Sequence, residues 1–210
     1  MKRILLAGAM MTLLLSSPMS GQTIKLPAPN MKRPSLSVME TFRQRKSERT
    51  FSTRNINRQL LSDLLWAAQG KNRDDGKLTT PTCMNWQEIR LYVFDAQGVS
   101  LYDPQTHTLS QVVRGDHRNL VAGGQDWAKE APISFVLVND MDKMGLHDER
   151  TREMTSVDIG ICTQNICLAC AAFGLNTVPR GTMDNAQIQK LLRLSQYQIP
   201  VMNNPIGYPK

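Results

Sequence analysis

The sequence predicts a single domain of the α+β class. Its 210 residues are enough for one hydrophobic core, which at this size removes about 70% of the unfolded surface from water. Helical and strand-like patterns follow one another without a strict βαβ alternation. Two β-prone runs, 89–94 and 99–102, are separated by the turn residues Ala96, Gln97 and Gly98. This spacing predicts antiparallel strands.

The first 21 residues have the pattern of a secretory signal peptide. Lys2 and Arg3 precede an apolar run over 4–15 that is too short to span a bilayer, and small residues follow over 16–21. We expect cleavage near Gly21, an exported, periplasmic protein, and no membrane insertion of the mature domain. An uncleaved N-terminal anchor is the alternative.

The charge of the chain favours anionic ligands. The net charge is +7, and loss of the two basic residues of the leader leaves +5. The basic residues are spread along the chain without interleaved aromatics or a recognisable reading helix, so we expect no nucleic-acid partner.

The N-terminal part of the mature chain predicts two helices. Residues 22–36, rich in Pro and Lys, predict an extended lead-in, and the domain proper is expected over 37–210. Ser37 and Glu40 form a capping box for a short helix that ends near residue 44. Apolar residues at helical spacing over 56–68 predict a second, amphipathic helix that stops at Gly70, followed by a polar loop up to Pro81.

The middle of the chain predicts the sheet. A third short strand is expected over 109–113, and short helices over 116–121 and 125–129 are broken by two glycines. The run 133–139 is almost continuously apolar between Pro132 and Asp140. It predicts a central strand that is buried on both faces.

The C-terminal part contains the longest periodic segment. After a polar loop over 141–153, residues 155–173 are apolar almost all round, which predicts a helix deep in the core or in a subunit interface, ending at Gly174. A short strand over 177–180, a helix over 185–192 capped by Asp184, and a last strand over 198–202 complete the prediction.

Two polar stretches are candidates for ligand binding, and the first is Arg45 to Phe51. Guanidinium groups suit bidentate contacts to phosphate oxygens, and Ser47 adds a hydroxyl and a backbone N–H at the turn. The stretch therefore predicts a phosphate-binding segment. A solvated helix end, favoured by the helix dipole, is the plainer alternative.

The second stretch runs from Thr79 to Gln87. It places hydroxyl, thiol, amide and aromatic groups in one loop directly after Pro81, as the edge of a flat heteroaromatic ring would require. Alternatively, Asn85 and Gln87 cap a turn and Trp86 belongs to the core.

The cysteines and histidines do not form a convincing reactive site. Four cysteines are too few for a disulfide framework, and Cys167 and Cys170 lie on a small-residue helix face without the Pro or Gly of a redox motif. We expect them to pack structurally, and we expect no metal site. The three histidines are expected at the surface.

Both stretches, in this order and about thirty residues apart, resemble segments of the FMN-dependent nitroreductase family, particularly its short branch related to thiazoline and peptide oxidases. Further matching segments run to the C-terminus: Leu64 to Gly70, Gln164 and Asn165, and Ile206 to Pro209. The resemblance implies a central, mostly antiparallel sheet flanked by helices, with the long buried helix at a homodimer interface.

The resemblance also implies how FMN is held. Arg45 and Ser47 match the residues that bind the phosphate, with Lys46 at the same end, and Arg49 matches a cation beside N1 and O2, where negative charge collects on reduction. The remaining matches are the backbone of Arg180 and Gly181 facing N5 and O4, Gln125 near the ring or ribityl chain, the ring-edge set Pro81, Thr82, Cys83, Asn85 and Gln87, and Lys210 in place of a longer basic tail.

Pro81 to Cys83 are implied to arrive from the partner subunit. The implied activity is an FMN-dependent oxidoreductase that passes electrons from a reduced donor, NAD(P)H in relatives, to a nitroaromatic, a quinone or a similar acceptor. A non-catalytic flavin- or ligand-binding envelope protein is the alternative, and a thiol enzyme that uses Cys83 is a third hypothesis.

Overall fold

The structure, a computed structural model, describes residues 21–210. The predicted signal peptide, apart from Gly21, lies outside the described residues. One seven-stranded sheet forms the centre of the domain, with strand order β1-β4-β3-β2-β5-β7-β6 and antiparallel pairing throughout. The strands are β1 (Thr23–Lys25), β2 (Ile89–Phe94), β3 (Gly98–Asp103), β4 (Thr108–Arg114), β5 (Ile133–Asp140), β6 (Asn176–Thr177) and β7 (Gln198–Gly207).

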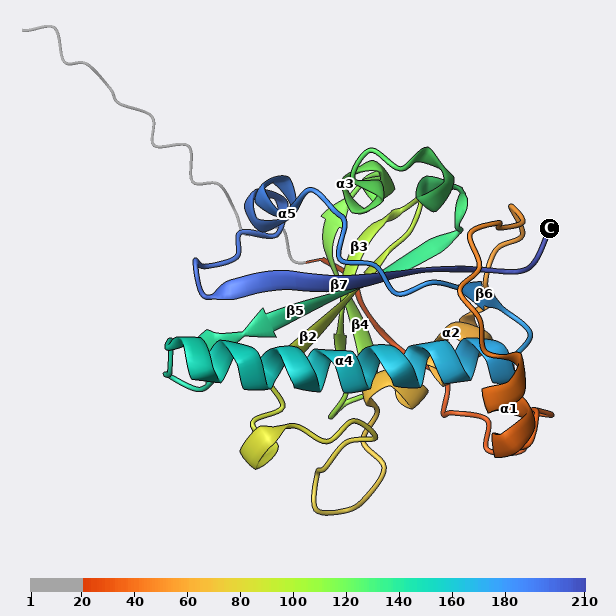
Figure 1. The fold of residues 1–210 in the computed structure, drawn as a ribbon, viewed down its shortest axis with the longest axis horizontal. Helices are drawn as coiled ribbons and strands as arrows, with labels where there is room; N and C mark the ends of the chain where they lie inside the picture. Colours follow the sequence, from red (N-terminus) through yellow and green to blue (C-terminus); the bar gives the residue numbers. More distant parts are fainter. Residues whose placement is uncertain (1–20) are drawn as a thin grey trace, which may run out of the picture.

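Helices cover both faces of the sheet, as predicted for an α+β domain (Figure 1). The α-helices are α1 (Val38–Gln44), α2 (Arg58–Gln69), α3 (Arg118–Ala122), α4 (Glu149–Ala172) and α5 (Asn185–Leu192), and 3-10 turns occur at η1 (Cys83–Asn85), η2 (Asp126–Glu130) and η3 (Met141–Lys143). Successive side chains of β2 point to opposite faces of the sheet, so the strand contributes to a hydrophobic core on each face. Leu91 and Val93 pack with α2 and α4, whereas Tyr92 and Phe94 pack with α3 and α5.

The predicted central strand is confirmed. β5 pairs with β2 on one side and with β7 on the other, and all eight of its residues are buried. Its near-continuous apolar sequence follows from this position, because the strand has helices on both faces and neighbours on both edges.

Three predicted helix starts are confirmed by their caps. The hydroxyl of Ser37 accepts from Glu40 N, the side chain of Asp184 accepts from Gln187 N, and α2 begins after Asn57. The predicted start of the long helix was wrong. α4 begins at Glu149 because the side chain of Asp148 accepts from Thr151 N, so residues 149–153 of the expected polar loop are helical.

The C-terminal strands also differ from the prediction. β7 extends five residues beyond 202, because Asn203 and Asn204, which interrupt the apolar pattern, are fully buried and hydrogen-bonded. The strand expected over 177–180 is shorter: only Asn176 and Thr177 pair with β7, and Arg180 makes an isolated bridge to Asn203.

The lead-in is fastened to the domain. Thr23–Lys25 adds an edge strand beside β4, and the ring of His107 lies 2.7 Å from the Ser62 hydroxyl and 3.1 Å from the carbonyl oxygen of Pro27. The expectation that His107 is a surface residue was therefore wrong. Burial lowers the pKa of His107, which favours the neutral ring that this network needs.

The cysteines agree with a packing role. All four are free, and Cys162, Cys167 and Cys170 are buried. Burial raises the pKa of each of these three thiols, that of Cys162 to about 12. Within residues 21–210, no group of three potential ligands could hold a metal ion, and no helix has the length and apolar character needed to cross a membrane.

Candidate functional site

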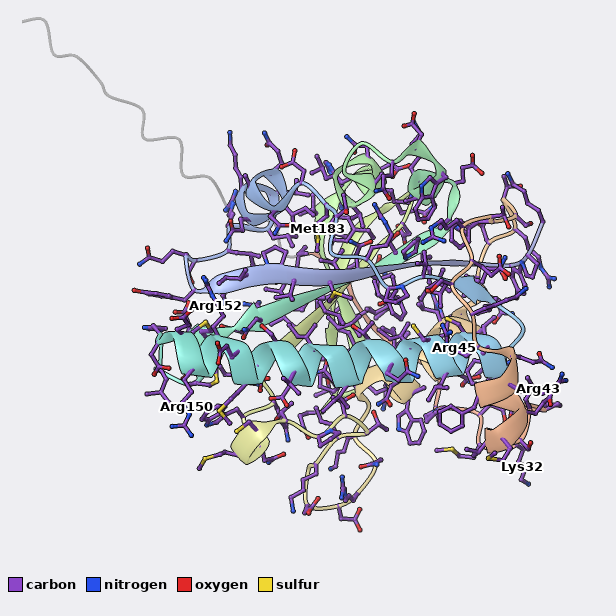
Figure 2. All side chains as sticks on the ribbon, viewed as in Figure 1. Lys32, Arg43, Arg45, Arg150, Arg152 and Met183 are labelled. Carbon is purple, nitrogen blue, oxygen red and sulfur yellow. The ribbon has the colours of Figure 1, made fainter. Side chains whose placement is uncertain are left out.

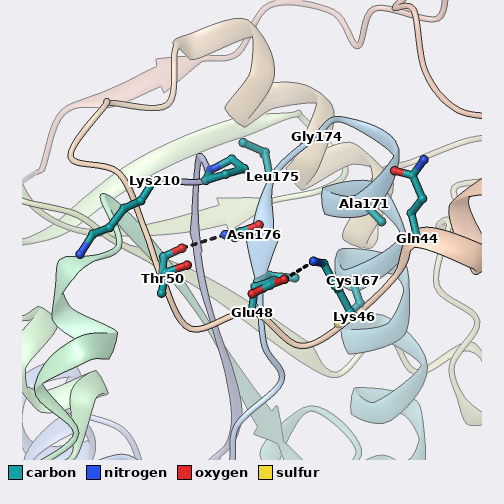
Figure 3. A pocket seen from close by; sticks show the side chains of 12 residues that line it. Gln44, Lys46, Glu48, Thr50, Cys167, Ala171, Gly174, Leu175, Asn176 and Lys210 are labelled. Carbon is teal, nitrogen blue, oxygen red and sulfur yellow. Dashed lines mark hydrogen bonds and ion pairs between the residues drawn. The ribbon is translucent and has the colours of Figure 1, made fainter.

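The cationic segment links α1 to α2 and is held against β6. Arg45 is the C-cap of α1, the amide of Glu48 donates to the carbonyl of Thr177 at 2.9 Å, and the side chain of Asn176 donates to the carbonyl of Thr50 at 2.8 Å. Figure 3 shows the cavity beside this segment, which has a volume of about 350 Å³ and is also lined by the end of α4 and by Lys210.

The cations of this segment are not equivalent. Lys46 pairs with Glu48 at 2.5 Å, and Lys210 pairs with Glu130 at 2.8 Å. Arg45 and Arg49, in contrast, have no carboxylate partner within residues 21–210. These two guanidinium groups are therefore the ones left free for an anionic ligand, together with the exposed hydroxyl of Ser47.

A second arginine lies beside Arg49. The guanidinium carbons of Arg49 and Arg180 are 5.9 Å and 5.0 Å from the ring centre of Trp127, and this indole stacks at 6.4 Å on Phe51. Burial lowers the pKa of Arg180, and the positive charge of Arg49 lowers it further. The structure thus brings together two arginines that the sequence placed far apart.

The side chain of Arg180 is rigidly held. Its terminal nitrogens donate to the carbonyl oxygens of Val121 (3.1 Å) and Ala122 (2.8 Å), to Asn203 Oδ1 (3.0 Å) and to Gln125 Oε1 (3.2 Å). Its Nε, although buried, has no partner among the described residues. The predicted residues Gln125 and Arg180 are therefore neighbours.

The backbone next to Arg180 is open. Gly181 is exposed, and a Cβ at this position would meet only the carbonyl oxygen of Val201, at 3.9 Å. A flat ligand can approach this backbone without displacing protein atoms, as the resemblance implied.

The Pro81–Gln87 loop is strained. Met84, Asn85 and Gln87 have φ angles of 50°, 57° and 52°, in the left-handed region that favours glycine. Strain of this kind persists only where the surroundings enforce it, and it is typical of binding sites.

Hydrogen bonds within the loop and to the preceding segment enforce the loop conformation. The amide of Gln87 donates to the Thr82 hydroxyl at 2.9 Å, and its side-chain nitrogen donates to the carbonyl of Gly76 (3.1 Å) and to Asn85 Oδ1 (3.3 Å). Asn85 and Gln87 therefore stabilise a turn, which was the plainer interpretation of this stretch. Trp86 is half-buried rather than a core residue, and Pro81 and Asn85 are exposed.

The loop is also anchored from outside. The amide of Cys83 donates to Asp158 Oδ2 on α4 at 2.8 Å, and Lys143 Nζ donates to the carbonyl oxygen of Gln87 at 2.6 Å. The thiol of Cys83 is half-buried, and its loop contains no histidine.

The two candidate segments do not meet within one protomer. The loop contacts α4 at Asp158, whereas Arg45 lies near Cys167, nine residues further along and therefore about 13 Å along the helix axis. Figure 2 shows Arg45 beside the C-terminal part of α4, at the opposite end from Arg150 and Arg152.

Three residues of these regions were missed in the sequence. Trp127 follows the expected Gln125 by two positions, so an aromatic ring next to a predicted ligand residue was the available signal. Glu88 and Asp158 are carboxylates within apolar patterns, and both are buried. Both could have been found in the sequence, because each places a charged residue at a position where the surrounding pattern predicts an apolar one.

Comparison with known proteins places this arrangement in a family. The sequence matches the nitroreductase family over residues 42–208. It is 23% identical over 197 residues to MJ1384 of Methanocaldococcus jannaschii, which carries a nitroreductase name, covering 89% of this chain and 98% of the relative. It is 24% identical over 187 residues to an FMN reductase (NAD(P)H) of Bacillus subtilis, covering 82% and 66%.

Solved structures agree with the sequence matches. A Ralstonia eutropha protein that carries a nitroreductase name superposes with a TM-score of 0.84 at 30% identity, covering 91% of each chain. Nitroreductase A of Vibrio parahaemolyticus has the same fold, with a TM-score of 0.63 at 20% identity over 82% of this chain and 66% of its own. The family match over residues 42–208 and the 30% identical structure show that this chain belongs to the nitroreductase family of oxidoreductases.

Proposed function

We propose that the protein is an FMN-dependent oxidoreductase that passes electrons from a reduced donor to a nitroaromatic, a quinone or a similar acceptor. One observation carries the proposal. Arg49 and Arg180 lie close enough for one to lower the pKa of the other, and neither has a carboxylate partner among the described residues. Two uncompensated cations side by side favour an electron-rich ligand between or beside them.

The residues present fit FMN. Arg45 and Ser47 would hold its phosphate, because Arg45 is unpaired within the described chain and the hydroxyl of Ser47 is exposed. Lys46 and Lys210 would contribute less, since each already pairs with a glutamate. The open backbone at Gly181 leaves room for a flat ring, and Gln125 is oriented by Arg180.

When bound, FMN supplies reversible two-electron chemistry. The chain's own contribution is binding and electrostatics. Arg49 and Arg180 would offset the negative charge that accumulates on electron uptake, and the hydrogen bonds that hold Arg180 mean that this side chain needs little reorganisation. No side chain of this site has to act as a general acid or base for that role.

The proposal includes a homodimer in which the Pro81–Gln87 loop of one protomer completes the site of the other. An exposed apolar stripe supports this assembly. Met154, Val157 and Ile161 follow one another at spacings of three and four residues on α4 and are 37%, 63% and 37% exposed. α1 adds Val38 and Phe42, which border an apolar groove of about 410 Å³ beside the end of α4.

We further propose that the protein belongs to the short branch related to thiazoline and peptide oxidases and works after export to the periplasm. The Pro81 to Gln87 motif supports the first proposal and the N-terminal residue pattern supports the second. Mass spectrometry of the protein recovered from a periplasmic fraction tests the second, with loss of about 21 residues as the expected result.

The decisive experiment is the visible spectrum of the purified mature protein, followed by titration of the apoprotein with FMN. A yellow protein, or a colourless one that binds added FMN, is expected. Stopped-flow reduction with NADH, NADPH and a dithiol in parallel then identifies the donor. A colourless protein that binds no FMN would overturn the proposal.

A second candidate is a flavin- or ligand-binding protein without turnover. The ion pairs of Lys46 and Lys210 favour it, because they leave fewer free cations at the phosphate end than the segment's sequence offers. Bound FMN that none of the three donors reduces would support this candidate over the enzyme.

A further inference from the structure

A buried carboxyl pair lies behind the Pro81–Gln87 loop. Glu88, the residue after the loop, is 0% exposed, and Asp158 of α4 is 6% exposed. Neither oxygen of Glu88 has a hydrogen-bond donor among residues 21–210. The group beside it is the carboxyl of Asp158, which itself accepts from the Cys83 amide through Oδ2.

Such a pair cannot carry two negative charges at low cost. An ionised Glu88 would be desolvated, would lack a donor and would face a like charge. A proton on Glu88 resolves all three problems, because Glu88 then donates to Asp158. Asp158 Oδ2 then continues to accept from the Cys83 amide.

The surrounding charges agree with one shared proton. Burial, together with the neighbouring carboxyl of Asp158, raises the pKa of Glu88 to about 7, while its own backbone amide and the charge of Lys143 act in the opposite direction. On the neighbouring strands, Arg90 and Asp140 form their own ion pair at 3.4 Å. Lys143 is the cation that lowers the pKa of Glu88, and its Nζ donates to the Gln87 carbonyl.

We propose that Glu88 and Asp158 are positioning residues that share one proton, and that the protonated pair holds the Pro81–Gln87 loop in the strained conformation that presents Asn85 to the flavin. The inference rests on the proposed function only where it says that the loop presents Asn85 to the flavin. Loss of the proton leaves two adjacent carboxylates, which move apart and release the Cys83 amide. The left-handed residues Met84 and Asn85 then lose their anchor.

The first arm of the test is independent of flavin. The amide resonance of Cys83 is followed by NMR in ¹⁵N-labelled protein from about pH 5.5 to about pH 8.5, a range that brackets the expected transition. We expect a transition near neutrality in the wild type and its absence in Glu88→Gln, which resembles the protonated acid. Lys143→Gln should shift the transition to higher pH, because it removes the cation that favours ionised Glu88.

The second arm measures the FMN dissociation constant over the same range. The wild type should lose about fivefold in affinity relative to Glu88→Gln between about pH 6 and about pH 8. The phosphate of FMN also titrates there, but identically for both proteins. Glu153→Gln, an exposed carboxylate on α4, serves as the control and should behave as the wild type.

The two arms separate the two hypotheses. A Cys83 transition without any FMN binding supports the carboxyl pair and rejects the proposed function. A wild-type protein whose Cys83 amide shows no transition, or a Glu88→Gln variant with the same transition, overturns the inference. If Glu88→Gln does not fold, an unshifted transition in Lys143→Gln overturns it instead.

Discussion

The segment from Arg45 to Phe51 and the Pro81–Gln87 loop are both polar and both lie near α4, yet they are held differently. The first is fixed through its backbone to β6 and leaves the side chains of Arg45 and Arg49 free. The second uses the side chains of Thr82, Asn85 and Gln87 to stabilise itself. Under the proposed function, the first segment would supply binding energy and the second would supply shape.

The largest test of this comparison is to separate the protomers. Val157→Glu combined with Ile161→Glu places charge on the exposed apolar stripe of α4, and we expect a monomer in light scattering. FMN affinity should then fall by more than about 200-fold, or about 3 kcal/mol, because the loop no longer reaches the partner's site.

Gln187→Glu, which adds a charge on the opposite layer at α5, is the matched control and should remain dimeric. A monomeric double variant that still binds FMN tightly would show that the loop takes no part in binding.

The next test removes a free cation. Arg45→Ala should weaken FMN binding by roughly 1.5–3 kcal/mol, the range for a hydrogen bond to a charged group, as measured by calorimetry. Lys46→Ala should cost clearly less, because Lys46 already pairs with Glu48. Equal losses in the two variants would contradict the distinction between free and paired cations.

The pH dependence of stability tests the buried carboxyl behind the loop. The pKa of Glu88 is raised from 4.5 to about 7, so the native state binds the proton more tightly than the unfolded state. The contribution of Glu88 to the free energy of unfolding is therefore fully present below about pH 4.5. It falls as the pH rises toward 7, by roughly 2 kcal/mol after allowance for solvent screening.

Urea unfolding of the wild type and of Glu88→Gln at several pH values measures this effect. The variant should lack this decrease between about pH 4.5 and pH 7. Parallel curves for the two proteins would mean that Glu88 does not retain its proton in the native state.

Arg49→Ala addresses the electrostatic role of the first segment. Loss of this cation should lower the flavin reduction potential by roughly 20–40 mV, which corresponds to about 1–2 kcal/mol for a two-electron couple. Arg54→Ala, whose guanidinium lies over Tyr208 at 4.1 Å, should leave the potential unchanged. An unchanged potential in Arg49→Ala would remove this role.

The smallest effect is expected at the C-terminus. Lys210→Ala should weaken FMN binding less than about fivefold, because Lys210 is exposed and paired with Glu130, and such pairs contribute about 1 kcal/mol or less. A loss as large as that of Arg45→Ala would show that Lys210 leaves Glu130 for the phosphate.

Much of the fold was predictable from local patterns. The capping box at Ser37, the apolar run of β5 and the stop at Gly174 are signals in which neighbouring residues determine the conformation. The errors fall where distant residues decide. β7 continues through Asn203 and Asn204 because other parts of the chain accept hydrogen bonds from their side-chain nitrogens, and α4 starts early because of the single cap at Asp148.

The sequence by itself determined the composition of the two candidate segments, their order along the chain and the resemblance to a flavoprotein family, because each depends on residue type and spacing. Only the tertiary structure decided which cations are free, that Arg49 and Arg180 both lie near the ring of Trp127, and that Glu88 and Asp158 are both buried. The physical reason is that pairing, burial and like-charge proximity arise between residues far apart in sequence, and no local pattern encodes those distances.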